Sequence, residues 1–169
     1  GLWSRVLSAV PGSRLLLKTA ALGDEKRCQA LRARLVAAGI GPDRVDLLGR
    51  TDSLSDHFAT YERADIALDT FPYHGTTTTC DALWMGVPVV TLLGQTHASR
   101  VGASLLSAVG MSELAATTQG RYVEIAASLA ADRERLAELR ATLRERLQRS
   151  PLCDGHGLAR RLEAALRSI

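Results

Sequence analysis

Residues 65–92 read DIALDTFPYHGTTTTCDALWMGVPVVTL, and this stretch decides the fold of the chain. Residues 65–69 form a short apolar run of the kind that makes a buried strand, and residues 88–92 form a second one. Between them, a glycine-containing loop over residues 70–75 is followed by a helical pattern over residues 76–85. A strand, a helix and a second strand in this order predict two parallel strands joined by a crossover helix.

The same alternation continues on both sides of this stretch. Further strands are predicted at residues 13–18 and 44–49, and further helices at residues 2–10, 24–38, 53–63 and 98–106. Apolar strands that alternate with helices predict an α/β fold with a Rossmann-like parallel sheet and helices on both of its faces. Because a doubly wound sheet normally begins with a strand and this chain opens on a helix, we expect that the first strand is missing.

The C-terminal part of the chain has a different pattern. Two helical segments are predicted between residues 120 and 149, and a last helix between residues 154 and 168. We therefore predict a Rossmann-like domain at residues 1–118, and C-terminal helices that pack on it at residues 119–169.

The composition argues against several classes of protein. The 169 residues are 46% hydrophobic and 23% charged, which supports a globular core and argues against disorder. No apolar run is long enough to span a bilayer, and the first residues lack the pattern of a signal peptide. The three cysteines lack the spacing of a disulfide framework or a zinc site. We therefore expect a cytoplasmic protein without a membrane partner.

The net charge of +3 is weak support for nucleic-acid binding. The arginines of residues 133–149 are interleaved with acidic residues, which is typical of a solvated, ion-paired helix face. Aromatic residues, which would stack on bases, make up only 4% of the chain. We expect no nucleic-acid partner, and a strongly salt-dependent affinity for any duplex would contradict this expectation.

Four consecutive threonines, residues 76–79, begin the helix after the glycine loop. Threonine is a mediocre helix former, but its hydroxyl and the free N–H groups of a first helical turn are good donors to an anion. Thr76, Thr77 and Thr78, with Gly75 beside them, are therefore candidate ligands of a diphosphate. The alternative is that Thr76 only caps the helix and the threonines after it are tolerated.

Three further side chains are expected at the same edge, because the carboxyl ends of parallel strands meet there. Asp81 could bind a sugar hydroxyl or only complement the helix dipole. His57 could stack on a base or be an ordinary surface histidine, and Arg100 could pair with a phosphate or with a partner domain. The chain lacks the motifs of dehydrogenases, P-loop NTPases, metalloproteases and serine hydrolases.

The segment DIALDTFPYHGTTTTCDALWMGVPVVTLLGQTHASRVGASLL, residues 65–106, resembles the C-terminal catalytic half of the protein O-GlcNAc transferase and SPINDLY family. The resemblance extends from LWSRVLSAVPGSRLLLK at residues 2–18 to RYVEIAASLAADRERLAELRATLRERLQRSPLCDG at residues 121–155, and so covers nearly the whole chain. This is a family of inverting glycosyltransferases with the GT-B fold, and tetratricopeptide repeats often precede the catalytic part.

Carried over position by position, the resemblance implies roles for the candidate residues. Thr77 and Thr78 match the threonines that hold the diphosphate of the nucleotide sugar, and Asp81 matches the carboxylate that binds the ribose hydroxyls. His57 matches the histidine that packs on the base.

Asp52 and Leu54 fall where backbone groups of the same loop meet the edge of the base in this family. Thr76 stands where the animal enzymes have a histidine, and the four-threonine motif looks more like that of the bacterial and SPINDLY branches. The resemblance implies transfer of GlcNAc from UDP-GlcNAc to Ser or Thr of an acceptor protein, with inversion and without a metal or other cofactor. The alternatives are GDP-fucose as donor, as in SPINDLY-type enzymes, and a non-catalytic nucleotide-binding or interaction module.

The resemblance also implies that this chain is one half of a larger enzyme. The N-terminal half of the GT-B fold and the tetratricopeptide repeats would belong to the parent chain. We therefore expect the chain alone to bind nucleotide weakly and to catalyse little.

Overall fold

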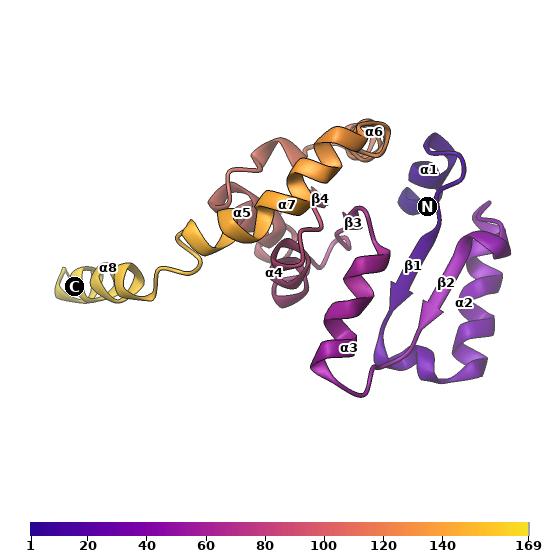
Figure 1. Cartoon of the computed structure of the whole chain (residues 1–169), viewed down its shortest axis with the longest axis horizontal. Helices are drawn as coiled ribbons and strands as arrows, with labels where there is room; N and C mark the ends of the chain where they lie inside the picture. Colours follow the sequence, from indigo (N-terminus) through magenta and orange to yellow (C-terminus); the bar gives the residue numbers. More distant parts are fainter. Residues whose placement is uncertain (169) are drawn as a thin grey trace.

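The computed structural model describes residues 1–168, and its strands form two separate groups in which every pairing is parallel (Figure 1). The first group pairs β1 with β2, so that Leu15 lies beside Val45 and Lys18 beside Leu48. The second group has the order β3-β4-β5, with β4 in the centre. The strands are β1 (Leu15–Lys18), β2 (Val45–Leu48), β3 (Ala67–Leu68), β4 (Val89–Leu92) and β5 (Ala115–Ala116).

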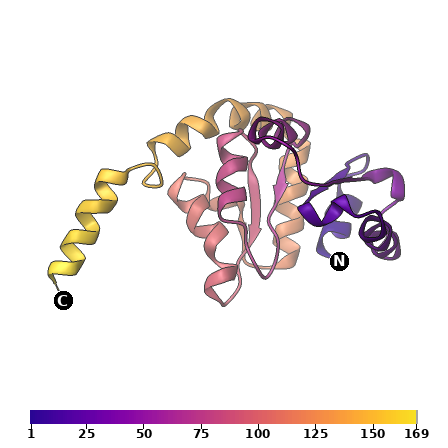
Figure 2. The same ribbon diagram turned by 90° about the horizontal axis from the view of Figure 1, so that it is seen from below.

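Helices connect the strands and surround them (Figures 1 and 2). The α-helices are α1 (Leu2–Ala9), α2 (Glu25–Ala37), α3 (Leu54–Ala59), α4 (Thr77–Trp84), α5 (Val101–Ala108), α6 (Gln119–Ala131), α7 (Arg133–Arg149) and α8 (Gly155–Arg167). Short 3₁₀ turns accompany them: η1 (Ala20–Gly23), η2 (Pro42–Arg44), η3 (Thr60–Arg63), η4 (His97–Ser99) and η5 (Ser112–Leu114).

Side-chain caps set the start of the helices that follow β1 and β2. Asp24 accepts a hydrogen bond from the backbone N–H of Arg27 at 3.1 Å, and Ser53 accepts one from the N–H of Asp56 at 3.0 Å. Both caps satisfy N–H groups that have no partner within the helix. The helix starts predicted at residues 24 and 53 are confirmed to within one residue.

The core has two parts that follow the two groups of strands. The larger part surrounds β4, all 4 residues of which are buried, and it draws on Leu83, Leu106 and Leu139. The smaller part lies around β1 and β2 and consists of Leu7, Leu15, Leu35, Ile40 and Val45. Because the larger cluster combines residues from α1, α4, α5, α6 and α7, the segments before and after residue 118 share one core.

The prediction of an α/β fold with parallel strands and flanking helices is confirmed. Three details differ from the sequence-based prediction. The strand β5 was not predicted, because two alanines carry no strand pattern. The helix expected from residue 98 begins only at Val101, because residues 97–99 form a 3₁₀ turn. The strands do not form one continuous sheet, since β1 and β3 are not hydrogen-bonded to each other.

The last helix, α8, projects away from the rest of the chain (Figures 1 and 2). Its apolar face of Leu158, Leu162 and Leu166 is 61%, 57% and 63% exposed. This differs from the expectation that all of residues 119–169 pack on the sheet, although α6 and α7 do so; residue 169 lies outside the described residues. An apolar stripe indicates that a helix has a face to cover, but not which element covers it.

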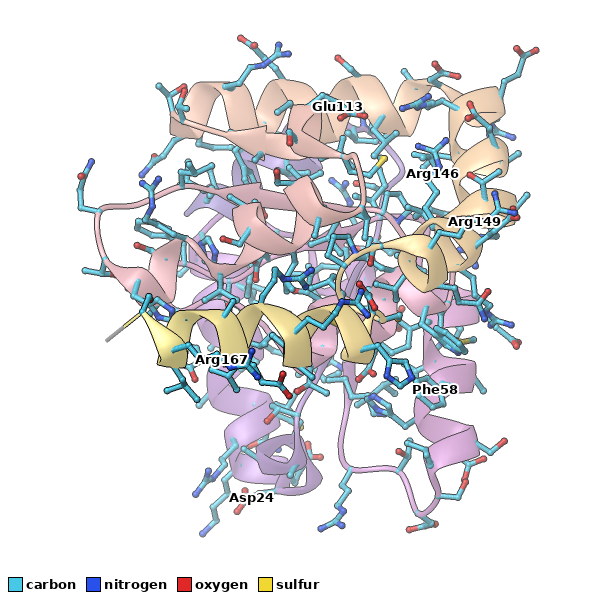
Figure 3. The ribbon with its side chains drawn as sticks, turned by 90° about the vertical axis from the view of Figure 1, so that its left-hand side faces the viewer. Asp24, Phe58, Glu113, Arg146, Arg149 and Arg167 are labelled. Atoms are coloured by element: carbon cyan, nitrogen blue, oxygen red, sulfur yellow. The ribbon has the colours of Figure 1, made fainter. Side chains whose placement is uncertain are left out.

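The surface of α7 carries the ion pairs that the sequence predicts. Arg135 and Arg146 both contact Glu138, at 3.4 and 3.1 Å, and Arg149 pairs with Glu145. Figure 3 labels Arg146 and Arg149 on this helix. Nowhere in residues 1–168 is a helix long and apolar enough to cross a membrane.

Candidate functional site

The candidate residues gather where β1, β2 and β3 end. A cleft of about 1510 Å³ opens at this edge and is lined by Lys18 at the end of β1, His57 in α3 and Thr78 in α4. In open α/β sheets this carboxyl edge is where ligands bind, because loops and helix N-termini converge on it. Among the residues selected from the sequence, five line this cleft: Asp52, Leu54, His57, Gly75 and Thr78. Thr76, Thr77, Asp81 and Arg100 are not among the residues that line it.

The N-terminus of α4 presents donor groups that have no partner within residues 1–168. Thr76 occupies the N-cap position, but its side chain makes no capping hydrogen bond. Thr76, Thr77 and Thr78 are all exposed, and their hydroxyls have no hydrogen-bond partner in the part of the chain that the structure describes. The capping alternative for Thr76 is thus not what the structure shows. The hydroxyls add to the free N–H groups and the positive dipole end, which together favour an anion.

The fourth threonine has a different, structural role. Thr79 is only 3% exposed, and its hydroxyl donates to the carbonyl of Gly75 at 2.9 Å. A Cβ atom on Gly75 would lie 2.3 Å from the Oγ1 atom of Thr78, which is closer than non-bonded atoms approach. Glycine at this position therefore leaves room for the hydroxyl of Thr78 at the helix start.

A chain of polar contacts runs from β1 through α3 to α4. The Nζ atom of Lys18 donates to Nδ1 of His57 at 2.7 Å and to the hydroxyl of Thr51 at 3.2 Å. Because lysine can only donate, Nδ1 of His57 carries the lone pair, and its protonated Nε2 faces Asp81 Oδ2 at 3.4 Å. Asp81 lies one helical turn after Thr78 and therefore on the same side of α4. His57, the candidate for contact with the base, is thus a neighbour of the threonines that are candidates for contact with the phosphates.

Two aromatic rings flank His57. The centroids of the Phe58 and Tyr61 rings each lie 5.6 Å from that of His57, and Tyr61 meets it edge-on. The Tyr61 hydroxyl donates to the carbonyl of Thr78 at 3.4 Å. Burial, followed by the nearby Asp81 carboxylate, raises the pKa of Tyr61 to about 12, so that it remains a donor at neutral pH. This contact joins the turn after α3 to the start of α4.

Asp69, at the end of β3, anchors the loop that leads to α4. One carboxylate oxygen accepts the backbone N–H of Gly75 at 2.9 Å, and the other accepts the Thr91 hydroxyl at 2.7 Å. The carbonyl of Asp69 accepts the hydroxyl of Tyr122 in α6 at 3.3 Å. The side chain is almost entirely buried, so these donors replace the water that a carboxylate otherwise needs.

His74 is also buried, at 2% exposure, and belongs to the scaffold of the same loop. Its Nδ1 accepts the backbone N–H of Gly102 at 3.1 Å, and its Nε2 donates to the carbonyl of Leu92 at 3.0 Å. Both ring nitrogens are therefore occupied, and His74 has no free nitrogen to offer a ligand. Fully paired networks of this kind hold a loop in one conformation.

The remaining sequence-predicted residues divide into two groups. Asp52 and Leu54 line the mouth of the cleft close to His57, and Leu54 is 68% exposed. Arg100 is exposed at the N-cap of α5, where it donates to the carbonyl of Gly94 at 3.3 Å, and it is not among the residues that line the cleft. The structure therefore groups Asp52 and Leu54 with His57, but not Arg100.

Sequence reasoning missed Lys18 and Tyr61. A charged residue at the last position of an otherwise apolar strand was a usable signal for Lys18, because that position opens onto the carboxyl edge. Tyr61 follows His57 by four residues, a spacing that brings side chains together on a helix. Burial raises the pKa of the Cys80 thiol, which disfavours the nucleophilic thiolate. Within residues 1–168, no three His, Cys, Asp or Glu side chains gather as a potential metal site.

Comparison with known proteins assigns the chain to a family. The family described as Glycosyl transferase family 41 matches residues 1–162. The chain belongs to this family. The resemblance to O-GlcNAc transferases and SPINDLY proteins, inferred from the threonine motif, is thereby confirmed.

Several relatives in family 41 match almost the whole chain. A Petunia hybrida protein named "Probable UDP-N-acetylglucosamine--peptide N-acetylglucosaminyltransferase SPINDLY" is 47% identical over 167 residues, which is 99% of this chain and 18% of that protein. A Caenorhabditis elegans UDP-N-acetylglucosamine--peptide N-acetylglucosaminyltransferase is 38% identical over 83% of this chain and 12% of its own length. The chain therefore spans less than a fifth of the length of these curated relatives.

A solved O-GlcNAc transferase structure has the same fold. A mutant O-GlcNAc transferase of Thermobaculum terrenum superposes with a TM-score of 0.91 at 41% identity, covering 99% of this chain and 32% of that one. The arrangement of the two groups of strands is therefore shared with a chain about three times as long.

Proposed function

We propose that this chain is the nucleotide-sugar-binding half of a protein O-glycosyltransferase. The reaction is transfer of GlcNAc from UDP-GlcNAc to a Ser or Thr hydroxyl of an acceptor protein, with inversion at the sugar. The observation that carries this proposal is the row of hydroxyls of Thr76, Thr77 and Thr78 at the start of α4, which have no partner in the described residues and lie one helical turn from the His57–Asp81 contact. Membership in family 41 and the names of the relatives support the same donor.

In this proposal the chain acts mainly on the leaving group. Breaking the bond between the sugar and the diphosphate places negative charge on the diphosphate oxygens. The hydroxyls of Thr77 and Thr78 and the first N–H groups of α4 donate to that charge and stabilise it as it develops. Because these hydrogen-bond donors stabilise the charge of the diphosphate, we expect the nucleotide sugar to bind without a metal ion. We assign no general base to this chain.

The nucleoside end would be held by the polar contacts that run from β1 to α4. His57 packs on the base, and Asp81 accepts from the ribose hydroxyls. Lys18 acts as a positioning residue, because its bond to Nδ1 keeps the proton of His57 on Nε2. Replacing Lys18 with Met should alter the ring-nitrogen NMR signature of His57 and weaken UDP binding. An unchanged His57 signature would remove this role.

A second candidate donor is GDP-fucose. Its support is the resemblance of the four-threonine motif to that of SPINDLY-type enzymes, together with the 47% identity of a SPINDLY relative against 38% for the worm enzyme. The names of both relatives give UDP-N-acetylglucosamine as the donor. The polar groups that surround the base differ between uracil and guanine, whereas the diphosphate contacts serve both nucleotides. UDP-GlcNAc and GDP-fucose are therefore distinguished by the residues that contact the base and not by those at the start of α4.

A titration with UDP, GDP and ADP, with and without Mg²⁺, tests the proposal. Binding would be followed by calorimetry and by chemical-shift changes at residues 76–81 and at His57. Saturable UDP binding that is indifferent to Mg²⁺ supports the UDP-GlcNAc donor, and a preference for GDP supports GDP-fucose. Saturable binding that leaves both regions unperturbed would refute the site assignment. The protein acceptor, the other half of the GT-B fold and the tetratricopeptide repeats are the partners that the proposal requires.

A further inference from the structure

One buried histidine joins the loop before α4 to three later elements of the chain. The side chain of His74 is completely buried, and its Nε2 donates to the carbonyl of Leu92, the last residue of β4, at 3.0 Å. Its Nδ1 accepts the N–H of Gly102 in α5 at 3.1 Å, and its backbone N–H donates to the carbonyl of Ala98 in η4 at 2.9 Å. Because a carbonyl only accepts and a backbone N–H only donates, the ring is the neutral tautomer with its proton on Nε2.

The contact with Gly102 satisfies the start of α5. The N-cap residue of this helix, Arg100, makes no side-chain capping hydrogen bond. The first N–H groups of a helix have no partner within the helix, so an acceptor from elsewhere has to replace water there. Nδ1 of His74 is that acceptor for Gly102, the second residue of α5. His74 therefore caps α5 from a loop that lies 28 residues earlier in the chain.

The missing side chain of Gly102 allows the ring to approach α5. A Cβ atom there would lie 3.1 Å from Nδ1 of His74, 2.4 Å from Oδ2 of Asp69 and 2.6 Å from Oγ1 of Thr91. The hydroxyl of Thr91 donates to the same Oδ2 atom at 2.7 Å. The end of β3, the middle of β4, the loop before α4 and the start of α5 therefore meet in one closely packed polar cluster.

The same cluster holds the residue that leads into α4. The N–H of Gly75, which follows His74, donates to Oδ1 of Asp69 at 2.9 Å. By contrast, the N–H groups of Thr77 and Thr78 have no hydrogen-bond partner within residues 1–168. The protein therefore fixes the backbone up to residue 75 and leaves the donors of the first turn of α4 available.

The hydrogen bonds of His74 give direction and not only stability. A buried hydrogen-bonded group contributes little more to stability than an apolar group of the same shape. A hydrogen bond is formed only over a narrow range of distance and angle, however, whereas apolar contacts are non-directional. Three such bonds from a single residue fix the orientation of His74, and with it the path of the peptide groups that follow.

We propose that His74 is a positioning residue for the diphosphate site, an inference that rests on the proposed function of the start of α4. By joining the loop to the start of α5, His74 sets the direction in which Thr77 and Thr78 present their donors to the ligand. A misplacement of about 1 Å, even by a substitution away from the reacting atoms, can cost an enzyme about 100-fold in rate. The base is held by His57 on α3, so a disturbance at His74 acts on the diphosphate and not on the nucleoside.

A matched pair of substitutions at residue 74 tests the proposal. Asparagine in His74→Asn keeps an acceptor for the N–H of Gly102, whereas leucine in His74→Leu has the same branching without an acceptor. We expect His74→Leu to bind UDP at least about 10-fold more weakly than His74→Asn in calorimetric titrations. Uridine, followed by chemical-shift changes at His57, should bind equally to both. Equal affinities for UDP would overturn the proposal, and so would an equal loss for uridine.

A second pair of variants, on α5, covers the case in which His74→Leu does not fold. Gly102→Ala displaces Asp69 and His74 from the side of α5, and it should weaken UDP binding. Val109→Ala is the control, because Val109 is buried just after the other end of the same helix. This control should lose stability but keep its affinity for UDP. Equal affinities for UDP in the two variants would contradict a link from α5 to the start of α4.

The amide NMR signals of Thr77 and Thr78 without nucleotide separate this proposal from the proposed function. They should shift in His74→Leu, shift less in His74→Asn and stay in place in Val109→Ala, whether or not the protein binds UDP. Absence of UDP binding by the unaltered protein would count against the proposed function, and these signals would still decide the role of His74. Signals that stay in place in both His74→Leu and Gly102→Ala would overturn that role.

Discussion

Replacing Thr77 and Thr78 together with valine separates ligand binding from folding at the start of α4. Both side chains are exposed, and neither hydroxyl has a partner within residues 1–168. Valine keeps the β-branched shape of threonine and removes only the hydroxyl. The substitution should therefore leave the free energy of unfolding within about 0.5 kcal/mol of the parent. Any large effect must come from a ligand.

The expected loss of binding follows from the two donors removed. A hydrogen bond to a charged group contributes about 1.5–3 kcal/mol. Losing two of them at the diphosphate removes about 3–6 kcal/mol of binding free energy, a loss of about 10² to 10⁴ in affinity for UDP. The N–H groups of the first turn remain, so some affinity for the diphosphate persists.

Calorimetric titration with UDP, together with urea unfolding, measures both quantities on the same samples. Thr79→Val is the control, because its buried hydroxyl donates to Gly75 and does not face solvent. This variant should lose about 1 kcal/mol of stability while retaining most of its affinity. The reasoning is refuted if the double variant binds UDP as tightly as the parent, or if it unfolds as readily as Thr79→Val.

Three further predictions concern the base, the scaffold and the pH dependence of the fold. His57→Ala should weaken UDP and UMP alike, by about 1–3 kcal/mol, because it removes stacking on the base; calorimetry that shows a loss for UDP only would contradict this role. Gly102→Ala should destabilise the fold by about 1–3 kcal/mol, because the new Cβ atom would lie 2.4 Å from Oδ2 of the buried Asp69. An unchanged midpoint of urea unfolding would contradict this, because it would show that Asp69 and its hydrogen-bond partners shift at no cost. The hydrogen bond from Arg14 lowers the pKa of Asp46, so this carboxylate stabilises the fold above its unfolded-state pKa of about 3.9. That stabilisation is lost as the pH falls through the lower folded-state pKa, and Asp46→Asn should remove this part of the acid dependence in unfolding measurements at neutral and acidic pH.

Local patterns in the sequence predicted most of the secondary structure. Apolar runs and glycine or proline at their ends placed four of the strands, and capping residues such as Asp24 and Ser53 placed helix starts. These signals work because neighbouring residues alone decide whether a short segment can form a strand or begin a helix. The Ala115–Ala116 strand carries no such signal, since it is a strand only because β4 lies beside it.

The candidate site was predicted in part for the same reason. The threonines at 76–78 stand out because they are poor choices for helix stability, and this is visible without a structure. Which of the four threonines face solvent was not visible, because Thr79 differs only in pointing toward Gly75. The buried position of His74 was equally hidden, since its partners at Leu92 and Gly102 lie on later elements of the chain.

The sequence by itself determined the alternation of strands and helices, the threonine-rich helix start and the family to which the chain belongs, because each of these is written in residues close together along the chain. The tertiary structure decided the rest. It joined Lys18, His57 and Asp81 in one chain of polar contacts, left α8 projecting with its leucines exposed, and left β1 and β3, which both line the cleft, unpaired with each other. These features depend on contacts, or on missing contacts, between segments that are distant in sequence. Distance in space between such segments is set by how the whole core packs and not by any local pattern.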